Sequence, residues 1–468
     1  MTRQPPLELE EREDCMIGTR RSSSVRLHVL AAAVALALTN VSGWGQEEGG
    51  APAPRSQTFV KLTNNANAVI AEPAASDPGK NRIVFLTVHP EHANMFNSWI
   101  ARELARRGYR TMMLNYYGPE QTYDEFLAPM AAAIKHLRSL PGAAKVVLIG
   151  GSTGGAEESF YQDVAENGTR VCQAPEVVYP CRGKDLDNLP KADAMIMLDI
   201  NAGAPLRTIA VDPAVDSQHP RERDAALDMF DPRNGFDAKT QAAKYSPQFA
   251  RKYLEAQGAR NNKLIEEALA RLARIEKDEG DYKDDEPFVV PGSSRMENGA
   301  RLDLADRHFM ARTHAPHPLL KTDGTLVTQV VPSVMPSVPG NADGVDTLER
   351  TTQNLTVRHF LSFYALRTTS QYAVTENDVK GIVWHSTVNS APGNVEGVRV
   401  PTLIMAGTCY GHMVMNEIVF DHSAARDKEF IAVEGGNHTL QPCKPEYGDT
   451  SKRAFDYLEG WLKKPGRL

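Results

Sequence analysis

The feature that most constrains this chain is a short apolar segment that leads directly into a glycine-flanked serine. Residues 145–149 read Lys-Val-Val-Leu-Ile, and the residues that follow place Ser152 between Gly150 and Gly154 in the pattern G-x-S-x-G. A serine on a sharp strand-to-helix turn needs small residues at these two positions, because the turn brings two stretches of backbone together. A phosphate-binding glycine loop is the alternative, but the segment has neither the Walker lysine nor the G-x-G-x-x-G spacing. We therefore predict a nucleophile elbow at Ser152.

Apolar runs alternate with helical patterns on both sides of this turn. Strands are predicted at 82–88, 110–114, 145–149, 194–198, 402–406 and 429–433, and helices at 93–107, 123–140 and 450–462. Short β-rich runs joined by helices long enough to cross over indicate parallel pairing, with helices on both faces of a buried sheet. The predicted fold class is therefore α/β, with a mostly parallel central sheet.

The strand rhythm stops between about residues 204 and 394. Within this part, apolar residues recur at helical spacing over 246–277, which predicts two helices. We interpret residues 204–394 as a largely helical lid inserted between two halves of one core, residues 81–203 and 395–468. Residues 47–80 form a linker and a first strand region in this interpretation.

The first 46 residues have the order of a secretory signal peptide. Arg20, Arg21 and Arg26 precede the apolar residues 29–38, and small residues follow. The apolar run is too short to span a membrane comfortably. We expect residues 1–46 to be a signal peptide and the mature protein to be secreted or periplasmic, with no stable membrane insertion; a retained single anchor is the alternative.

Composition narrows the choice of partner. Hydrophobic residues make up 41% and charged residues 24% of the chain, as in ordinary globular proteins. The 52 Lys and Arg residues against 59 Asp and Glu residues give a formal net charge of −7, which leaves no broad cationic surface for a phosphate backbone. We expect a small-molecule substrate and no nucleic acid, and oligomeric state is left open.

If the chain is exported, its cysteines are expected to form disulfides. Cys15 would leave with the signal peptide, so the mature chain keeps four, at 172, 181, 409 and 443. We predict the disulfides Cys172–Cys181 and Cys409–Cys443, because each pair brackets one loop, although four cysteines allow three pairings. The chain has no CxxC motif and no Cys/His zinc spacing, so we expect no metal and no cofactor.

With its strand, serine turn and α/β rhythm, the chain resembles the α/β-hydrolase superfamily over most of residues 80–465. Members of this superfamily order the nucleophile, the acid and the histidine along the chain in that sequence. The resemblance implies that Ser152 is the nucleophile and that a histidine follows the last strand. Residues 430–438 read as a strand, a glycine turn and a histidine, so His438 is the expected general base.

The acid departs from the common pattern. The resemblance places an aspartate three residues after a glycine such as Gly407, but Tyr410 stands there, and a neutral tyrosine cannot stabilise an imidazolium. Glu417 is the nearest carboxylate downstream and is our first candidate. Asp199, which follows the strand before that loop, and Asp421 are the alternatives.

The resemblance also implies an oxyanion hole. One donor is the backbone N–H of Thr153, the residue after the nucleophile. The second comes from the first strand-to-helix loop, where the chain reads His89-Pro90-Glu91. Proline has no N–H, so Glu91 is the expected donor and His92 is the alternative.

These residues predict a serine hydrolase that cleaves a carboxylic ester through an acyl-enzyme. Two alternatives remain. One is a lactonase or carbon–carbon bond hydrolase on the same triad. The other is a non-catalytic ligand-binding protein on a hydrolase scaffold, which Tyr410 keeps open. Tyr116, Tyr117 and His412 are predicted to face the site.

Overall fold

The computed structural model describes residues 56–468, apart from residues 64, 74–76, 90–93, 117–121, 184–185, 207–210, 220–221, 294–299 and 334–351. The predicted signal peptide, residues 1–46, therefore lies outside the described residues. The described residues belong to one compact unit, Ala51–Leu468. None of the helices in the described part of the chain is long and apolar enough to cross a membrane.

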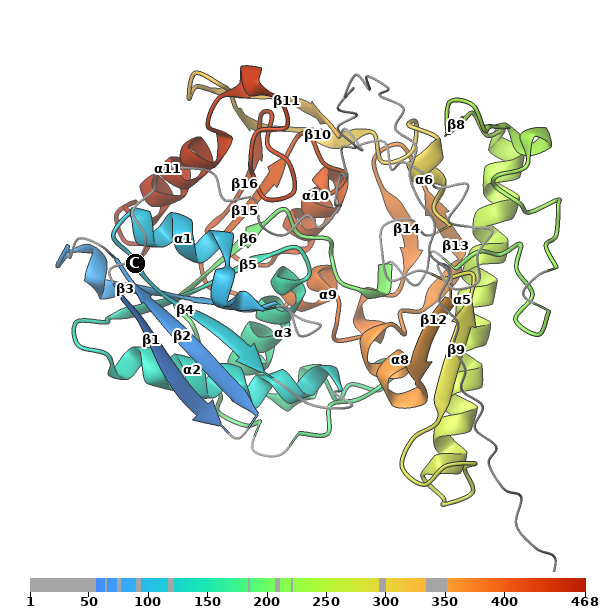
Figure 1. Ribbon diagram of the computed structural model, residues 1–468, viewed down its shortest axis with the longest axis horizontal. Coiled ribbons are helices and arrows are strands. Elements are labelled where there is room, and N and C mark those ends of the chain that lie inside the picture. The colour runs from blue at the N-terminus through green and yellow to red at the C-terminus, as the bar shows by residue number, and fades with distance from the viewer. Residues whose placement is uncertain are drawn as a thin grey trace, which may run out of the picture. The chain divides into compact units, whose positions relative to one another are not determined.

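A ten-stranded sheet forms the centre of this unit (Figure 1). In spatial order its strands are β1 (Ser56–Thr63), β2 (Ala66–Glu72), β4 (Arg110–Tyr116), β3 (Ile83–Thr87), β5 (Lys145–Gly151), β6 (Ala194–Leu198), β15 (Thr402–Gly407), β16 (Lys428–Val433), β10 (Arg312–Leu320) and β11 (Leu326–Pro332). The seven strands from β4 to β10 pair in parallel, while β1, β2 and β11 are antiparallel to their neighbours. All five residues of β6 are buried, as expected for a central parallel strand that is covered on both faces.

Helices cover both faces of the sheet. Helices α1 (Trp99–Arg106) and α11 (Thr450–Leu462) pack Ile100, Leu104, Phe455, Leu458 and Trp461 against one face. Helices α2 (Leu127–Ser139), α3 (Gly154–Asn167) and α10 (Met413–His422) pack against the other. The alternation of strand and helix in the sequence therefore corresponds to the two helical layers that parallel crossovers require.

The insertion differs from the predicted lid. One helix of 29 residues, α5 (Pro247–Ile275), replaces the two predicted helices. Its start is well defined, because Ser246 caps it by accepting a hydrogen bond from the N–H of Phe249 at 3.1 Å and Pro247 occupies the first turn. Figure 1 shows α5 at the outer side of the insertion, away from the central sheet.

The insertion is also less helical than predicted. It contains the strand pairs β9 (Pro287–Pro291) with β12 (Thr352–Thr356) and β13 (Thr368–Val374) with β14 (Val379–Ile382), besides the short helices α6 (Leu302–Ala305), α8 (Val357–Phe363) and α9 (Ala391–Val395). It further supplies β10 and β11 to the central sheet. Strand β10 was not predicted because it contains two prolines, which are unusual inside a sheet. The strand is compatible with them because it pairs with β16 only at Leu319 and Leu320, beyond both prolines.

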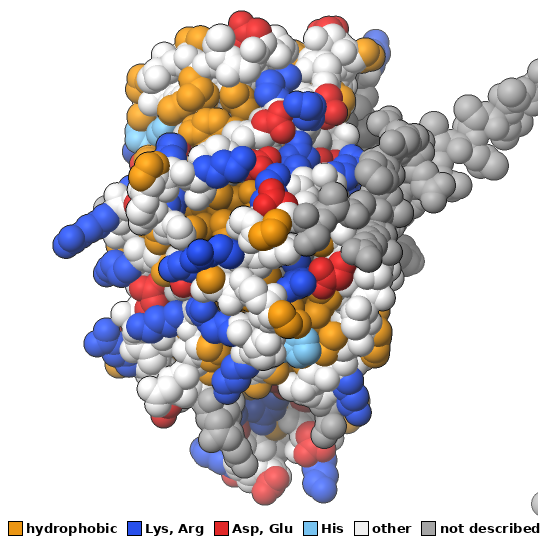
Figure 2. Space-filling model, turned by 90° about the vertical axis from the view of Figure 1, so that its left-hand side faces the viewer, with side chains coloured by type: hydrophobic (Ala, Val, Ile, Leu, Met, Phe, Trp, Pro, Cys, Tyr) orange, Lys and Arg blue, Asp and Glu red, His pale blue; other side chains and the backbone are white. Residues whose placement is uncertain are grey.

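Two disulfides join Cys172 to Cys181 and Cys409 to Cys443, which confirms both predicted pairings. On the face shown in Figure 2, Lys and Arg side chains lie among acidic and hydrophobic ones and form no continuous cationic patch. On helix α11, Lys452 pairs with Asp456 at 2.6 Å.

Candidate active site

Ser152 stands at the sharp turn between β5 and α3. Strand β5 ends at Gly151, α3 begins at Gly154, and Ser152 has a φ of 55°. A non-glycine residue in this left-handed region is strained, and such strain persists where the surrounding structure enforces it. The N–H of Ser152 donates to the carbonyl of Leu198 at 3.3 Å, so the serine lies beside the end of β6.

The glycines around Ser152 allow the backbone segments to touch. A Cβ at Gly150 would lie 2.7 Å from the carbonyl carbon of Gly154, and a Cβ at Gly154 would lie 2.6 Å from the carbonyl oxygen of Val88. These two contacts explain the two glycines of the motif. Gly155 is a third requirement that the sequence reading missed, since a Cβ there would lie 2.4 Å from Cγ2 of Ile200.

His438 follows β16 in a tightly bonded loop. Oδ1 of Asn437 accepts hydrogen bonds from the N–H of Thr439 at 2.9 Å and from the N–H of Gln441 at 3.0 Å. A Cβ at Gly407 would lie 2.3 Å from the carbonyl oxygen of Gly436, so the loop after β15 packs directly on the histidine loop. Nδ1 of His438 lies 2.7 Å from a carboxylate oxygen of Asp199.

The carboxylate that His438 contacts is therefore Asp199. This residue follows β6 with a φ of 48° and is fully buried. Its Oδ1 accepts a hydrogen bond from the N–H of Gly407 at 3.0 Å, while its Oδ2 faces His438. Burial raises the pKa of Asp199, but hydrogen bonds from His412 and His438 outweigh burial and lower it below its ordinary value. The carboxylate is thus held ionised beside the imidazole.

Glu417, the first candidate for the acid, lies elsewhere. It is fully buried on α10 and accepts hydrogen bonds from the N–H groups of His314 and Ala315 at 2.8 and 3.0 Å and from Nε2 of His317 at 2.7 Å. All three donors belong to β10. The expectation that Glu417 orients His438 is therefore wrong, because α10 turns this side chain toward a strand that the sequence did not reveal.

Asp421, the remaining candidate, is half-exposed one helical turn further along α10. Its Oδ2 lies 3.6 Å from Nε2 of His314, and burial raises its pKa. It shares the β10 side of α10 with Glu417, so its carboxylate belongs to the same contact between α10 and β10.

Tyr410, which stands at the sequence position where an acid was expected, packs on the face of the His438 ring. The two rings stack with their centroids 4.5 Å apart and an interplanar angle of 21°. His412, two residues further on, is buried, and its Nδ1 lies 3.0 Å from the backbone oxygen of Asp199. Its ring meets that of His438 edge to face at 5.0 Å.

The region expected to bind an oxyanion is partly described. Thr153 is buried at the start of α3, and its Oγ1 lies 3.3 Å from Nε2 of His89. This contact joins the elbow to the loop after β3. Glu91, the expected second donor, lies outside the described residues, as does Tyr117. Tyr116 is buried and donates its hydroxyl to Glu157 on α3 at 2.5 Å.

Asp199, His412 and His438 are also the one group in the described part of the chain with three metal-ligating atoms within 4.8 Å of one another. Metal binding would require a lone pair on both histidine nitrogens. Nδ1 of His412 faces a backbone carbonyl, which only accepts, so this nitrogen carries a proton. With Nδ1 protonated, Nε2 is the nitrogen that His412 could offer to a metal, and hydrogen bonds from the two imidazoles to Asp199 already account for the proximity of the three groups.

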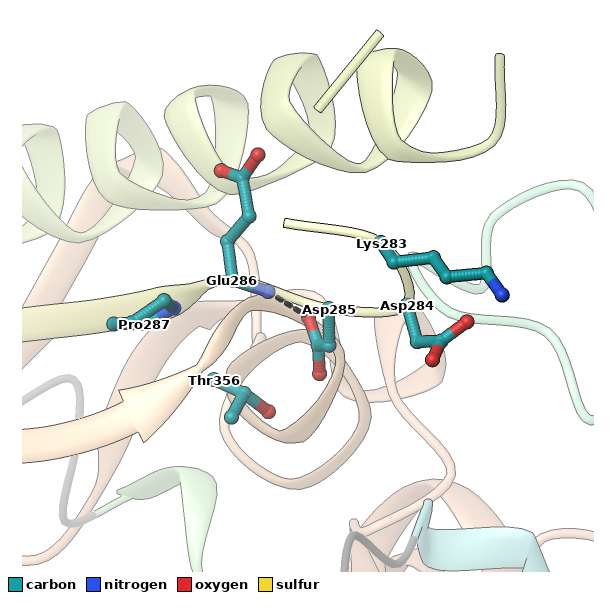
Figure 3. A pocket seen from close by; sticks show the side chains of 6 residues that line it. All are labelled: Lys283, Asp284, Asp285, Glu286, Pro287 and Thr356. Atoms are coloured by element: carbon teal, nitrogen blue, oxygen red, sulfur yellow. Dashed lines mark hydrogen bonds between the residues drawn. The ribbon is translucent and has the colours of Figure 1, made fainter. Parts of the chain in front are cut away.

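A separate pocket lies in the insertion (Figure 3). Its lining residues are Lys283, Asp284, Asp285, Glu286, Pro287 and Thr356. Figure 3 shows Glu286 turned toward α5, where it binds Nε of Arg271 at 2.8 Å. None of the predicted site residues lines this pocket, and its buried glutamate is already paired.

The order of strands, the two helical layers and the serine elbow at the carboxyl end of β5 define an α/β-hydrolase fold. No protein-family model matches the chain, and no curated protein matches it either.

Solved structures resemble it at low identity. A hypothetical protein from Pseudomonas aeruginosa is 12% identical, with a TM-score of 0.42 over 90% of this chain and 96% of that chain. A siderophore hydrolase, EstB from Aspergillus fumigatus, is 12% identical, with a TM-score of 0.39 over 89% and 98%. A monoglyceride lipase from Saccharomyces cerevisiae is 10% identical, with a TM-score of 0.39 over 88% and 96%. The fold assignment rests on the topology and the elbow, and not on these likenesses.

Proposed function

We propose that the protein is a serine hydrolase that cleaves a carboxylic ester, with Ser152 as nucleophile, His438 as general base and Asp199 as the acid that orients it. The observation that carries the proposal is the 2.7 Å contact between His438 Nδ1 and Asp199 Oδ2. Ser152, with a φ of 55°, bonds through its N–H to Leu198, the residue before Asp199. Serine, acid and histidine follow the ends of β5, β6 and β16, and parallel strands present their carboxyl ends at one edge of the sheet.

The chemistry follows from these positions. Nδ1 of His438 donates to Asp199, so the neutral imidazole has its lone pair on Nε2 and can take the proton of Ser152 as Oγ attacks the acyl carbon. The N–H of Thr153 and a donor from the loop containing Glu91 would stabilise the oxyanion. His438 then returns the proton to the departing alcohol. Water, activated by the same histidine, releases the acid from the acyl-enzyme and regenerates Ser152.

The alternative of a decayed, non-catalytic scaffold depended on the missing aspartate at position 410. Asp199 answers that argument, because this buried carboxylate follows another strand and contacts the histidine. A lactonase or a carbon–carbon bond hydrolase would use the same three residues, and analysis of the products distinguishes them from an esterase. The two disulfides support export to an oxidising compartment, in keeping with a signal peptide.

A fluorophosphonate probe tests the proposal without knowledge of the substrate, because it labels only an activated serine. We expect the wild type to be labelled and Ser152→Ala to be unlabelled. Ser139→Ala, which alters an exposed serine at the end of α2, is the matched control and should be labelled like the wild type. A folded wild-type protein that resists the probe, or undiminished labelling of Ser152→Ala, would contradict the proposal.

A further inference from the structure

A second histidine, His412, contacts the same carboxylate as His438. Its Nδ1 lies 3.0 Å from the backbone oxygen of Asp199 and 3.4 Å from Oδ2 of that residue. The side chain is buried at the start of α10. Asp199 is therefore approached by two imidazoles, one from each of the loops that follow β15 and β16.

The partners of His412 determine where its proton lies. A backbone carbonyl has no proton to give, so Nδ1 of His412 must donate. A histidine carries one proton on Nδ1, and this proton lies between the carbonyl oxygen and Oδ2 of Asp199, with the shorter distance to the carbonyl. The Nδ1–H dipole of His412 thus points its positive end toward Asp199, and the hydrogen bond from His438 to Asp199 is unchanged.

The helix does not need this side chain for its start. The backbone oxygen of His412 accepts the N–H of Asn416 at 2.9 Å and Nδ2 of Asn416 at 2.8 Å. Asn416 in turn holds the residue after Asp199, since its Nδ2 donates to the carbonyl of Ile200 at 2.8 Å and its Oδ1 accepts the N–H of Ile200 at 3.2 Å. The backbone of this junction is therefore held by Asn416, which leaves the imidazole of His412 to act on Asp199.

We infer that His412 is a positioning residue of the catalytic centre, which acts through Asp199: its Nδ1–H is bonded to the backbone oxygen of Asp199 and lies close enough to Oδ2 to keep the buried carboxylate ionised and available to His438. The inference rests on the proposed function. Loss of a donor to a buried carboxylate makes the Asp199–His438 pair bind its proton more tightly. The direction of the pKa of Asp199, which hydrogen bonds from both histidines lower against the effect of burial, agrees with this role.

Among the residues that the structure describes, two titratable side chains, His412 and His438, interact with the carboxylate of Asp199. The structure places His412 from the loop after β15 and His438 from the loop after β16 against its carboxylate. Tyr410 packs on both imidazoles, at 4.7 Å from His412 and 4.5 Å from His438. Glu417 faces β10 instead. A shift in the acid limb of activity on replacing His412 is therefore assignable to the Asp199–His438 pair.

The test compares variants with and without the donor. His412→Leu and His412→Phe remove it, while His412→Asn keeps an N–H close to the position of Nδ1. The rate of fluorophosphonate labelling of Ser152 is measured from pH 5 to pH 9 for each folded variant. We expect the acid limb of this profile to move up by about one pH unit in His412→Leu or His412→Phe, the size expected for one lost hydrogen bond to a charged group. His412→Asn should restore most of the wild-type limb.

His422→Asn, at the far end of α10 and bonded to Glu396, is the control and should leave the limb in place. A folded His412→Leu or His412→Phe with an unmoved limb would overturn the inference, as would an equal shift in His412→Asn. Nitrogen NMR of the wild type gives an independent test, in which the signal of His412 is the one missing from His412→Asn. We expect Nδ1 of His412 to carry a proton near pH 7. An unprotonated Nδ1 would refute the inference. If the wild type is not labelled at all, the proposed function fails instead.

Discussion

The substitution Asp199→Asn tests the assignment of the acid most directly, because the structure predicts the orientation of the new amide. Oδ1 of Asp199 accepts the N–H of Gly407 at 3.0 Å, and only an oxygen can remain there. The amide nitrogen must therefore replace Oδ2, which lies 2.7 Å from Nδ1 of His438. Two donors cannot face each other at this distance, so His438 adopts the other tautomer, with its proton on Nε2.

The magnitude follows from this tautomer. A histidine with a proton on Nε2 cannot accept the proton of Ser152, and the corresponding change in the general Ser-His-Asp template costs about 10⁴ in rate, or about 5.5 kcal/mol in transition-state free energy. The size and shape of the side chain are nearly unchanged, so the fold should survive. Activity and stability therefore separate in this variant.

The rate of fluorophosphonate labelling is the assay, with thermal unfolding and circular dichroism as the check on folding. Glu417→Gln is the matched control, because it also neutralises a fully buried carboxylate. We expect labelling to fall by about four orders of magnitude in Asp199→Asn and to persist in folded Glu417→Gln. Labelling of Asp199→Asn within about tenfold of the wild type would refute the assignment of the acid, and loss of labelling in folded Glu417→Gln would return the role to that residue.

Two further predictions concern stability. Burial raises the pKa of Glu417 in the folded protein, but the hydrogen bonds from His317 and from two backbone N–H groups outweigh burial and lower it. The ionised Glu417 therefore stabilises the fold fully above its unfolded pKa, and this contribution is lost as the pH falls through the folded pKa. Glu417→Gln should lower the free energy of unfolding by about 3 kcal/mol at pH 7, and urea titrations should show this difference shrinking below about pH 4; a difference that does not depend on pH would contradict the reasoning. The Cys409–Cys443 disulfide closes a separation of 34 residues, so replacing both cysteines by serine should cost about 4 kcal/mol in the same titration, and a cost below about 1 kcal/mol would show that the loops stay ordered without the disulfide.

Six of the seven parallel strands of the central sheet, all but β10, were predictable because each is a compact apolar run. The predicted strand at 194–198 and the predicted helix at 450–462 coincide with β6 and α11. These elements are bounded by polar residues and glycines, and their side chains are buried where the pattern is apolar. The elbow at Ser152 was predictable for a related reason, since close backbone contacts leave glycine as the residue that fits.

The acid could not be selected from the sequence, because the choice depended on a strand that carries no strand signal. Pro316 and Pro318 obscure β10, yet this strand receives the side chain of Glu417 and so removes it from the vicinity of His438. Asp199 was kept as an alternative on position alone. Its contact with His438 joins residues 239 positions apart, which local sequence patterns do not report.

The position of Asp199 divides the site into a part held by the sheet and a part held by loops. Gly151 pairs with Leu198 in the register of β5 and β6, so the residues after them, Ser152 and Asp199, begin from neighbouring positions on adjacent strands. The histidine has no such support, since His438 lies five positions beyond Val433, the last residue of the Lys428–Val433 strand.

Three contacts replace that support. Oδ2 of Asp199 holds the imidazole at 2.7 Å, Tyr410 stacks on its face, and the disulfide from Cys409 to Cys443 joins the loop after β15 to the loop that carries His438. Tyr410 and Cys409 both belong to the loop that usually carries the acid. In the proposed triad the acid follows β6, so this loop does not have to supply it, and packing on His438 accounts for the tyrosine at position 410.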